Sequence, residues 1–241
     1  MHASGGSFSN AARNLGQIAR SPVSLAFFAV VMLVQMFVSA KGGPDFVSAW
    51  YENLGLSRGG FLSGKVWQVL SYGLLHGGWW HAGLNALFVL LVGSRIEHMA
   101  GRPAMARVIV LGILGGGVAH LVLGAGLLVG MSGGCVALLL CLTTLSPQSR
   151  MFPLPVSGRS LGLGILIAEL ILALIDPAVK LPGLSLIGRW MVDHGMESCF
   201  RMGHACHFGG GMAGWACGRW ILRPRVTLDR LRRDRARREA G

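Results

Sequence analysis

A serine and a histidine stand out because each lies beside glycines within a strongly hydrophobic stretch. They are Ser132, between Gly130 and Gly133, and His207, close before a run of three glycines. Polar side chains inside membrane-spanning segments are costly and are therefore candidates for function. A serine hydroxyl becomes a nucleophile when an adjacent imidazole takes its proton. The pair therefore predicts acyl transfer, provided that the fold brings the two side chains together.

Two further polar residues, His81 and Asn85, are spaced so that they share one helix face. Two neutral donors aimed at one cavity would stabilise a developing oxyanion, and backbone N–H groups beside Ser132 would contribute. His76 lies in the preceding loop, where a structural role is the simpler interpretation.

Other histidines leave two alternatives open. His204 lies one helical turn before His207 and is the rival candidate for the base. A metal-dependent hydrolase using His76, His81, His204 and His207 is the second alternative, although the sequence contains no CxxC or similar zinc spacing.

The composition predicts an integral membrane protein. The chain has 241 residues, of which 52% are hydrophobic and 13% are charged, whereas about 25% of the residues of a soluble domain are charged. The 37 glycines are typical of closely packed transmembrane helices. We predict an all-α bundle of six transmembrane helices, at residues 22–40, 79–95, 105–123, 128–146, 160–176 and 204–222.

The distribution of charge predicts the orientation of these spans. With the N-terminus inside, most of the 22 Lys and Arg residues fall on the cytoplasmic side, as the positive-inside rule favours. Both termini are then cytoplasmic, in a bacterial inner membrane, and Ser132 and His207 both lie near the outer face. The segment Val38–Ala40 resembles a signal-peptide cleavage site, but the apolar run before it is longer than usual, which favours an uncleaved first span.

We divide the chain into a cytoplasmic N-terminal segment (1–21), a membrane domain (22–222) and an Arg-rich tail (223–241). Nine arginines fall between Arg219 and Arg238, so we expect a partly helical tail that binds anionic lipid headgroups, with a solvated, disordered tail as the alternative. No aromatic residues alternate with these arginines, which argues against nucleic-acid binding. Residues 41–78 and 177–203 form long outer loops, and the second is a candidate gate. Cys199 and Cys206 are a weakly supported disulfide pair.

Taken together, the spaced motifs resemble those of the rhomboid family of intramembrane serine proteases, over about residues 60–220. The motifs are His76-x4-His81-x3-Asn85, Glu97-x3-Gly101, Gly130-x-Ser132-Gly133 and His207-x2-Gly210-x3-Gly214.

This resemblance implies a six-helix core in which Ser132 is the nucleophile and His207 the general base and acid. It also implies an oxyanion hole made by His81, Asn85 and the Ser132 backbone N–H, and a structural role for Glu97. His76, Gly101, Gly130, Gly133, Gly210 and Gly214 complete the structural motif.

Two positions depart from the family pattern. Val136 replaces an aromatic residue that stacks on the histidine, and Trp67-Gln68 replaces a Trp-Arg pair.

The resulting prediction is a serine endopeptidase that cleaves transmembrane segments of membrane proteins and needs no cofactor. Because the pattern contains no carboxylate behind the histidine, we expect a simple Ser–His dyad and slow turnover. The main alternative is an inactive rhomboid-like protein that binds or routes membrane clients. A relative that trims C-terminal anchoring tags is a further variant of the protease.

Overall fold

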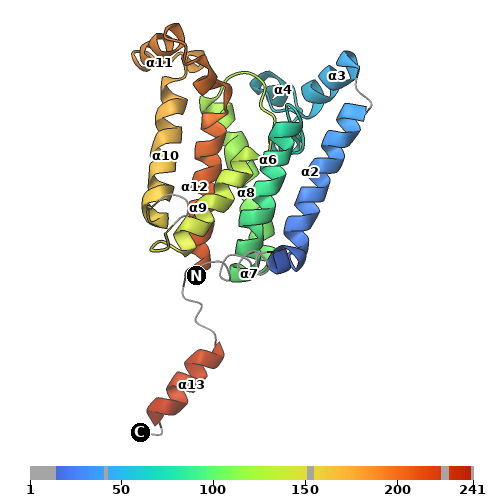
Figure 1. The fold of residues 1–241 in the computed structure, drawn as a ribbon. Coiled ribbons are helices and arrows are strands. Elements are labelled where there is room, and N and C mark those ends of the chain that lie inside the picture. Colours follow the sequence, from blue (N-terminus) through green and yellow to red (C-terminus); the bar gives the residue numbers. More distant parts are fainter. Residues whose placement is uncertain (1–14, 41–42, 151–154, 224–227, 240–241) are drawn as a thin grey trace, which may run out of the picture.

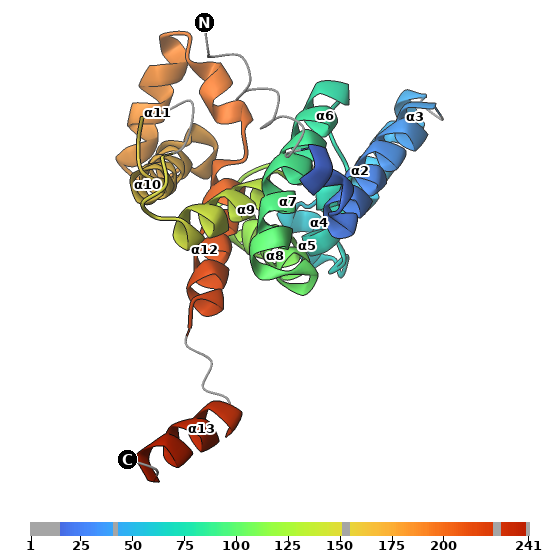
Figure 2. The same ribbon diagram turned by 60° about the horizontal axis from the view of Figure 1, so that its bottom comes forward.

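The computed structural model describes residues 15–40, 43–150, 155–223 and 228–239, and within these ranges the chain is helical and forms no strand. The expectation of an all-α fold is therefore confirmed. The principal helices lie side by side and form one bundle, with α10 and α2 at opposite edges (Figures 1 and 2).

Each of the six predicted spans overlaps a helix or a continuous helical segment. These are α2 (Pro22–Ala40), α6 (Trp79–Phe88) continuing through the π-helical turn η2 (Val89–Gly93) into α7 (Ser94–Ala100), α8 (Arg102–Leu123), α9 (Ser132–Leu145), α10 (Gly158–Ile175) and α12 (His204–Ile221). By length and composition, α2, α8 and α10 can each cross a membrane, and α9 is a shorter apolar helix. The number of crossings stays a prediction.

The two long connections contain short helices rather than open loops. The first contains α3 (Pro44–Leu54), α4 (Arg58–Leu62), α5 (Gln68–Ser71) and the 3₁₀ turn η1 (Tyr72–Leu74). The second contains η3 (Pro177–Val179), α11 (Leu184–Asp193) and η4 (Glu197–Arg201). Figure 1 shows α3, α4 and α11 at the same end of the bundle.

Gln68 anchors the first connection from within. Its buried amide nitrogen donates to the carbonyl of Glu52 at 3.0 Å, and its amide oxygen accepts from the N–H of Ser57 at 3.3 Å. Arg58 donates from Nη2 to the carbonyl of Leu121 at 2.7 Å and so satisfies a free carbonyl at the end of α8. At position 68, where the family pattern has an arginine, Gln68 thus holds this segment through its side-chain amide.

At the end of the bundle opposite the first connection, Glu97 links α7 to α2. Its carboxylate accepts hydrogen bonds from the backbone N–H groups of Val23 and Ser24, at 3.2 and 3.0 Å, and from Ser24 Oγ at 2.9 Å. These amides belong to the first turn of α2, whose N–H groups have no partner within the helix. Gly101 follows with φ +90°, a conformation that favours glycine, and reverses the chain into α8. These contacts give Glu97 a structural role.

The chain outside the bundle is described in part. The tail forms α13 (Leu228–Glu239), in agreement with the expectation of a partly helical segment. Residues 1–14 of the predicted N-terminal segment, and residues 224–227 and 240–241 of the predicted tail, lie outside the described residues. The boundaries of the three segments stay predictions.

Candidate active site

Ser132 is the first residue of α9, and a tight turn before it fixes its position. Gly130 has φ +116° and donates its N–H to the carbonyl of Tyr72 at 2.9 Å. A Cβ atom at Gly130 would lie 2.5 Å from Cε1 of His81. Only glycine fits here, because any side chain would be strained by the backbone angle and would collide with the imidazole.

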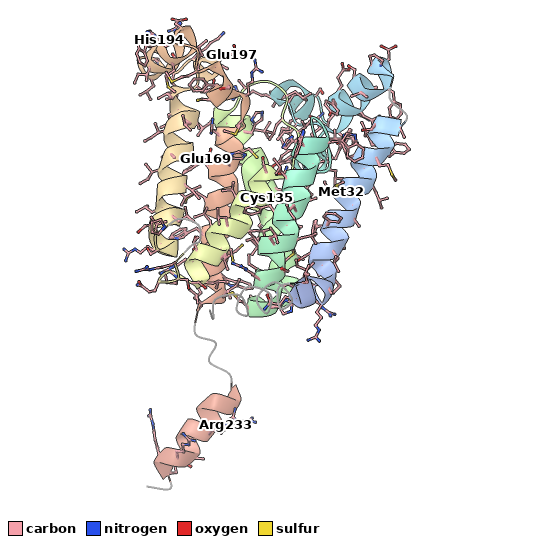
Figure 3. All side chains as sticks on the ribbon, in the orientation of Figure 1. Met32, Cys135, Glu169, His194, Glu197 and Arg233 are labelled. Atoms are coloured by element: carbon pink, nitrogen blue, oxygen red, sulfur yellow. The ribbon has the colours of Figure 1, made fainter. Side chains whose placement is uncertain are left out.

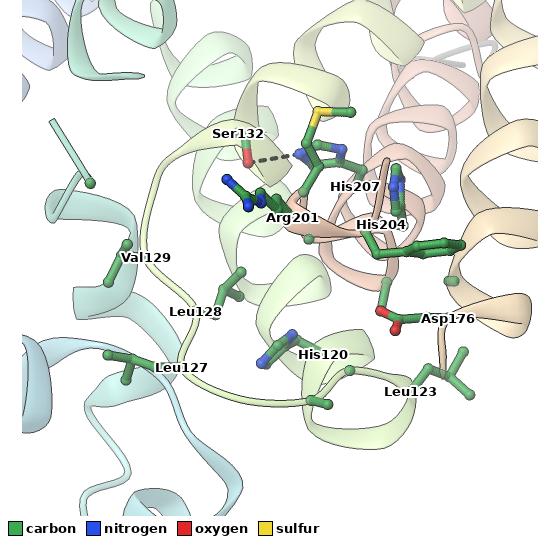
Figure 4. A pocket seen from close by; sticks show the side chains of 18 of the residues that line it. His120, Leu123, Leu127, Leu128, Val129, Ser132, Asp176, Arg201, His204 and His207 are labelled. Carbon is green, nitrogen blue, oxygen red and sulfur yellow. Dashed lines mark hydrogen bonds between the residues drawn. The ribbon is translucent and has the colours of Figure 1, made fainter. Parts of the chain in front are cut away.

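His207 lies in the first turn of α12, and its ring faces Ser132. The distance from Ser132 Oγ to His207 Nε2 is 2.8 Å (Figure 4). This is hydrogen-bond distance, and it joins two residues that are 75 positions apart in the sequence. The structure therefore brings together the serine and histidine that the sequence singled out.

Close contact between α9 and α12 makes this distance possible. A Cβ atom at Gly210 would lie 2.1 Å from the carbonyl oxygen of Gly133, and one at Gly214 would lie 2.0 Å from that of Ala137. Neither position has room for a methyl group. The glycines at 210 and 214 therefore allow the close approach of α12 to α9.

Behind His207 lies a carboxylate that the sequence analysis did not identify. Glu169 of α10 places Oε1 3.1 Å from Nδ1 of His207 and Oε2 2.7 Å from Nδ1 of His204. Figure 3 labels Glu169 between α10 and α12. The expectation of a histidine without a carboxylate partner is therefore wrong, because packing of α10 against α12 supplies one from a separate span.

His204, the rival base, is directed away from the serine. Its ring lies between the Glu169 carboxylate and the carbonyl oxygen of Cys199, which is 2.5 Å from His204 Nε2. Both ring nitrogens are thus occupied by acceptors. His204 supports the site and does not contact the Ser132 hydroxyl.

Val136 takes no part in holding the His207 ring by stacking, since it has no aromatic ring. It approaches α12 one turn further on, where its Cγ1 would lie 3.3 Å from a Cβ atom at Gly211. The ring of His207 is held by Glu169 and Ser132 through its two nitrogens.

The predicted oxyanion donors line the same cavity as the serine. Asn85 is buried, and among the described residues its Nδ2 has no hydrogen-bond partner, whereas its Oδ1 is 3.7 Å from Cys135 Sγ. A buried donor without a partner is costly, so this amide is free for a ligand. His81 lies on the same helix, and the backbone N–H of Ser132 is among the four at the start of α9 that have no partner within the helix.

These groups open into a cavity of about 590 Å³ at the end of the bundle where α9 and α12 begin. Ser132, His81, Asn85 and His207 line it, together with residues of the second long connection such as Arg201 (Figure 4). The volume falls within the range of ligand sites. A peptide segment that enters the cavity would meet the hydroxyl and the candidate donors together.

His76 supports the turn before the serine. Its Nε2 accepts the N–H of Met131 at 3.3 Å, and its carbonyl accepts the hydroxyl of Tyr51 at 2.5 Å. Burial, with a smaller contribution from His81, lowers the pKa of His76 to about 4. His76 is therefore neutral at physiological pH and can accept this hydrogen bond, which agrees with the structural role predicted for it.

Within the described residues, one group of side chains is close enough to hold a metal ion, and it consists of Glu169, His204 and His207. The alternative set predicted from sequence also contained His76 and His81, which instead pack edge-to-face on each other with ring centroids 5.0 Å apart. Cys199 and Cys206 are free thiols, so the disulfide that the sequence left as a weakly supported possibility is not formed.

Glu169 could have been noticed in the sequence from its position alone. It is the one carboxylate within the predicted span 160–176 that does not lie at its end, and an ionisable residue inside a span is a functional candidate. The sequence could not show that its partners are on α12.

Comparison with known proteins shows the family of the chain. The rhomboid domain family matches residues 63–224. A stretch of 78 residues, 32% of this chain, is 38% identical to rhomboid-related protein 3 of Homo sapiens. The match covers 19% of that relative's length. The chain belongs to the rhomboid family, and with its apolar helices it is an integral membrane protein.

Proposed function

We propose that this rhomboid family member is an intramembrane serine endopeptidase in which Ser132 attacks and His207 transfers the proton. The observation that carries the proposal is the 2.8 Å contact between Ser132 Oγ and His207 Nε2 at the wall of a cavity. A hydroxyl in contact with an imidazole base is the arrangement needed for nucleophilic catalysis.

The reaction would proceed as acyl transfer in two stages. His207 Nε2 takes the Ser132 proton while Oγ attacks a peptide carbonyl, and the oxyanion is held by Asn85, His81 and the Ser132 N–H. His207 then gives the proton to the leaving amine. Water, activated by the same imidazole, hydrolyses the acyl-enzyme and releases the acid.

The proposed substrates are transmembrane segments of other membrane proteins. Support comes from the position of the cavity at one end of a bundle whose helices are apolar enough to lie in lipid. We further propose that this end faces the outer side of a bacterial inner membrane and that both termini are cytoplasmic; the positive-inside pattern of the sequence supports the proposed orientation. A substrate helix must unwind locally, because its peptide bonds are otherwise protected by hydrogen bonds along the helix.

Fluorophosphonate labelling and cleavage of a tagged single-span protein test this function. We expect wild-type protein and the control Ser48→Ala, an exposed serine on α3, to label and to cleave. Ser132→Ala should do neither. Cleavage should also persist in a chelator, because neither the nucleophile nor the base requires a metal.

Each contrary result has a definite meaning. A wild-type protein that is folded but neither labels nor cleaves would support the alternative, a rhomboid-like protein that binds membrane clients without cutting them. Activity that a chelator abolishes and zinc restores would support the metal-dependent alternative, centred on Glu169, His204 and His207.

A further inference from the structure

We propose that Glu169 is a positioning residue that converts the Ser132–His207 pair into a Ser–His–Glu triad, with His204 as the counter-charge of the carboxylate. The inference rests on the proposed function of the same site. It explains how His207 is held in its working orientation and protonation state.

The first step in the argument concerns His204. Its Nδ1 is 2.7 Å from Glu169 Oε2 and its Nε2 is 2.5 Å from the carbonyl oxygen of Cys199. A neutral imidazole has one donor and one acceptor nitrogen, whereas an imidazolium has two donors. The carbonyl oxygen of Cys199 can only accept, so Nε2 of His204 carries a proton. We infer that Nδ1 also donates, to an ionised Glu169, and His204 is then positively charged.

The second step concerns the state of Glu169. A carboxylate in a membrane-embedded bundle needs a partner of opposite charge, and the His204 imidazolium at 2.7 Å is that partner. Glu169 can then remain ionised and accept hydrogen bonds through both oxygens. Its second oxygen, Oε1, lies 3.1 Å from Nδ1 of His207.

The third step gives the consequence for His207. An ionised carboxylate accepts but does not donate, so the proton of neutral His207 must lie on Nδ1. The lone pair is then on Nε2, which faces Ser132 Oγ at 2.8 Å. This is the tautomer that can take the serine proton. When Nε2 is protonated during attack, Glu169 stabilises the resulting imidazolium.

The arrangement also supplies the mechanical support of the ring. The His207 ring is held against rotation, because its Nε2 contacts Ser132 of α9 and its Nδ1 contacts Glu169 of α10. His81, Arg201 and Asp176 line the same cavity, but among the described residues only Glu169 is an acidic partner of His207 in an ion pair.

Steady-state kinetics of carboxylate variants provide the first test. In the full chain we expect Glu169→Gln to lower kcat by about 10²-fold or more, since disturbing the tautomer through the equivalent carboxylate of a serine protease triad costs about 10⁴. KM should change by less than about threefold, because Glu169 does not line the substrate cavity. Glu169→Asp should recover at least about a tenth of wild-type kcat by restoring the charge. Glu52→Gln, an exposed carboxylate on α3, should match wild type.

Nitrogen-15 NMR of histidine-labelled protein provides a second test that does not depend on cleavage. In wild type the His207 signal should report a proton on Nδ1, and in Glu169→Gln the population should shift toward the Nε2-protonated form. If Glu169 were only a packing residue, its loss would reduce the folded fraction but leave the tautomer of the folded protein unchanged.

The outcomes separate this inference from the proposed function. Wild-type kcat and an unchanged His207 tautomer in Glu169→Gln would overturn the inference, while loss of activity in Ser132→Ala would still support the protease. A Ser132→Ala protein that cleaves would overturn the protease, and NMR would still decide the role of Glu169. Dependence of wild-type activity on added zinc would overturn the inference, because Glu169 would then be a metal ligand.

Discussion

The polar atoms around this site divide into those that have hydrogen-bond partners and two, Asn85 Nδ2 and His76 Nδ1, that have none among the described residues. The nitrogens of His207 and His204 each have a partner within hydrogen-bond distance. Asn85 Nδ2 is buried without one. A fold does not leave a donor buried and unpaired without cost, so the free amide marks the place where a substrate oxygen would complete the site.

Replacing Asn85 with alanine separates catalysis from stability. We expect kcat to fall by about 10²–10³-fold, the usual cost of losing one oxyanion donor. The midpoint of thermal unfolding should stay the same or rise, because the variant removes a buried donor that the free protein does not satisfy. Asn53→Ala, an exposed residue on α3, is the matched control. An Asn85→Ala protein with normal kcat would exclude the amide from the oxyanion hole.

The titration of His76 should make the free energy of unfolding depend on pH. Its pKa of about 4 in the fold is lower than the ordinary value of about 6.5 in the unfolded chain. Below pH 6.5 the unfolded chain therefore binds the proton first. The contribution of His76 to stability is complete above about pH 6.5 and is lost as the pH falls toward 4, by about 1.4 kcal/mol per pH unit.

Denaturant unfolding in detergent between pH 7 and pH 4.5 measures this effect. The difference in unfolding free energy between wild type and His76→Gln should shrink as the pH falls, because glutamine does not titrate. A difference that stays constant with pH would show that His76 keeps an ordinary pKa.

At the scale of the elements, the contact between α9 and α12 controls the site. Each helix contributes one residue of the proposed catalytic pair from its first turn, so a small displacement of either helix separates Ser132 from His207. The faces that meet are built from glycine, including Gly133, Gly210 and Gly214. Helices in lipid gain no hydrophobic free energy by associating, because their apolar side chains are already out of water. Such close backbone packing is therefore a main source of helix association.

A methyl group at Gly214 should push the helices apart. The new Cβ of Gly214→Ala would lie 2.0 Å from the backbone oxygen of Ala137, which cannot move aside as a side chain can. We expect unfolding to be easier by about 1–3 kcal/mol and cleavage to fall with it. Gly164→Ala on α10 is the matched control, because nothing lies within 4 Å of its new methyl group. Alanine there should stabilise the helix by about 0.5–1 kcal/mol. Equal behaviour of the two variants would contradict the tight contact.

At the scale of the whole molecule, the candidate site lies at one end of the bundle, and the tail helix α13 carries a concentration of basic residues. In α13, the described side chains of Arg232, Arg235, Arg237 and Arg238 are exposed. We propose that this helix binds anionic headgroups, since basic residues near a membrane surface contribute about 1 kcal/mol each.

Trypsin digestion in nanodiscs tests the tail in the intact protein. Discs containing phosphatidylglycerol should protect the tail arginines more than discs of phosphatidylcholine alone. The protection should fall as salt is raised toward 1 M, where the screening length drops to about 3 Å. Equal digestion in both lipids would support the solvated tail instead.

The sequence by itself determined the membrane class, the positions of the helices at the six predicted spans, and the serine, histidine and asparagine of the candidate site. These follow from properties that act locally along the chain, such as runs of apolar residues, helical spacing and glycine next to a polar residue. Only the tertiary structure decided what lies behind His207. Glu169 comes from another span, 38 residues away, and no local pattern specifies which faces of two apolar helices meet. That choice depends on the packing of small residues across the whole bundle, and it turns an isolated intramembrane carboxylate into the partner of two histidines.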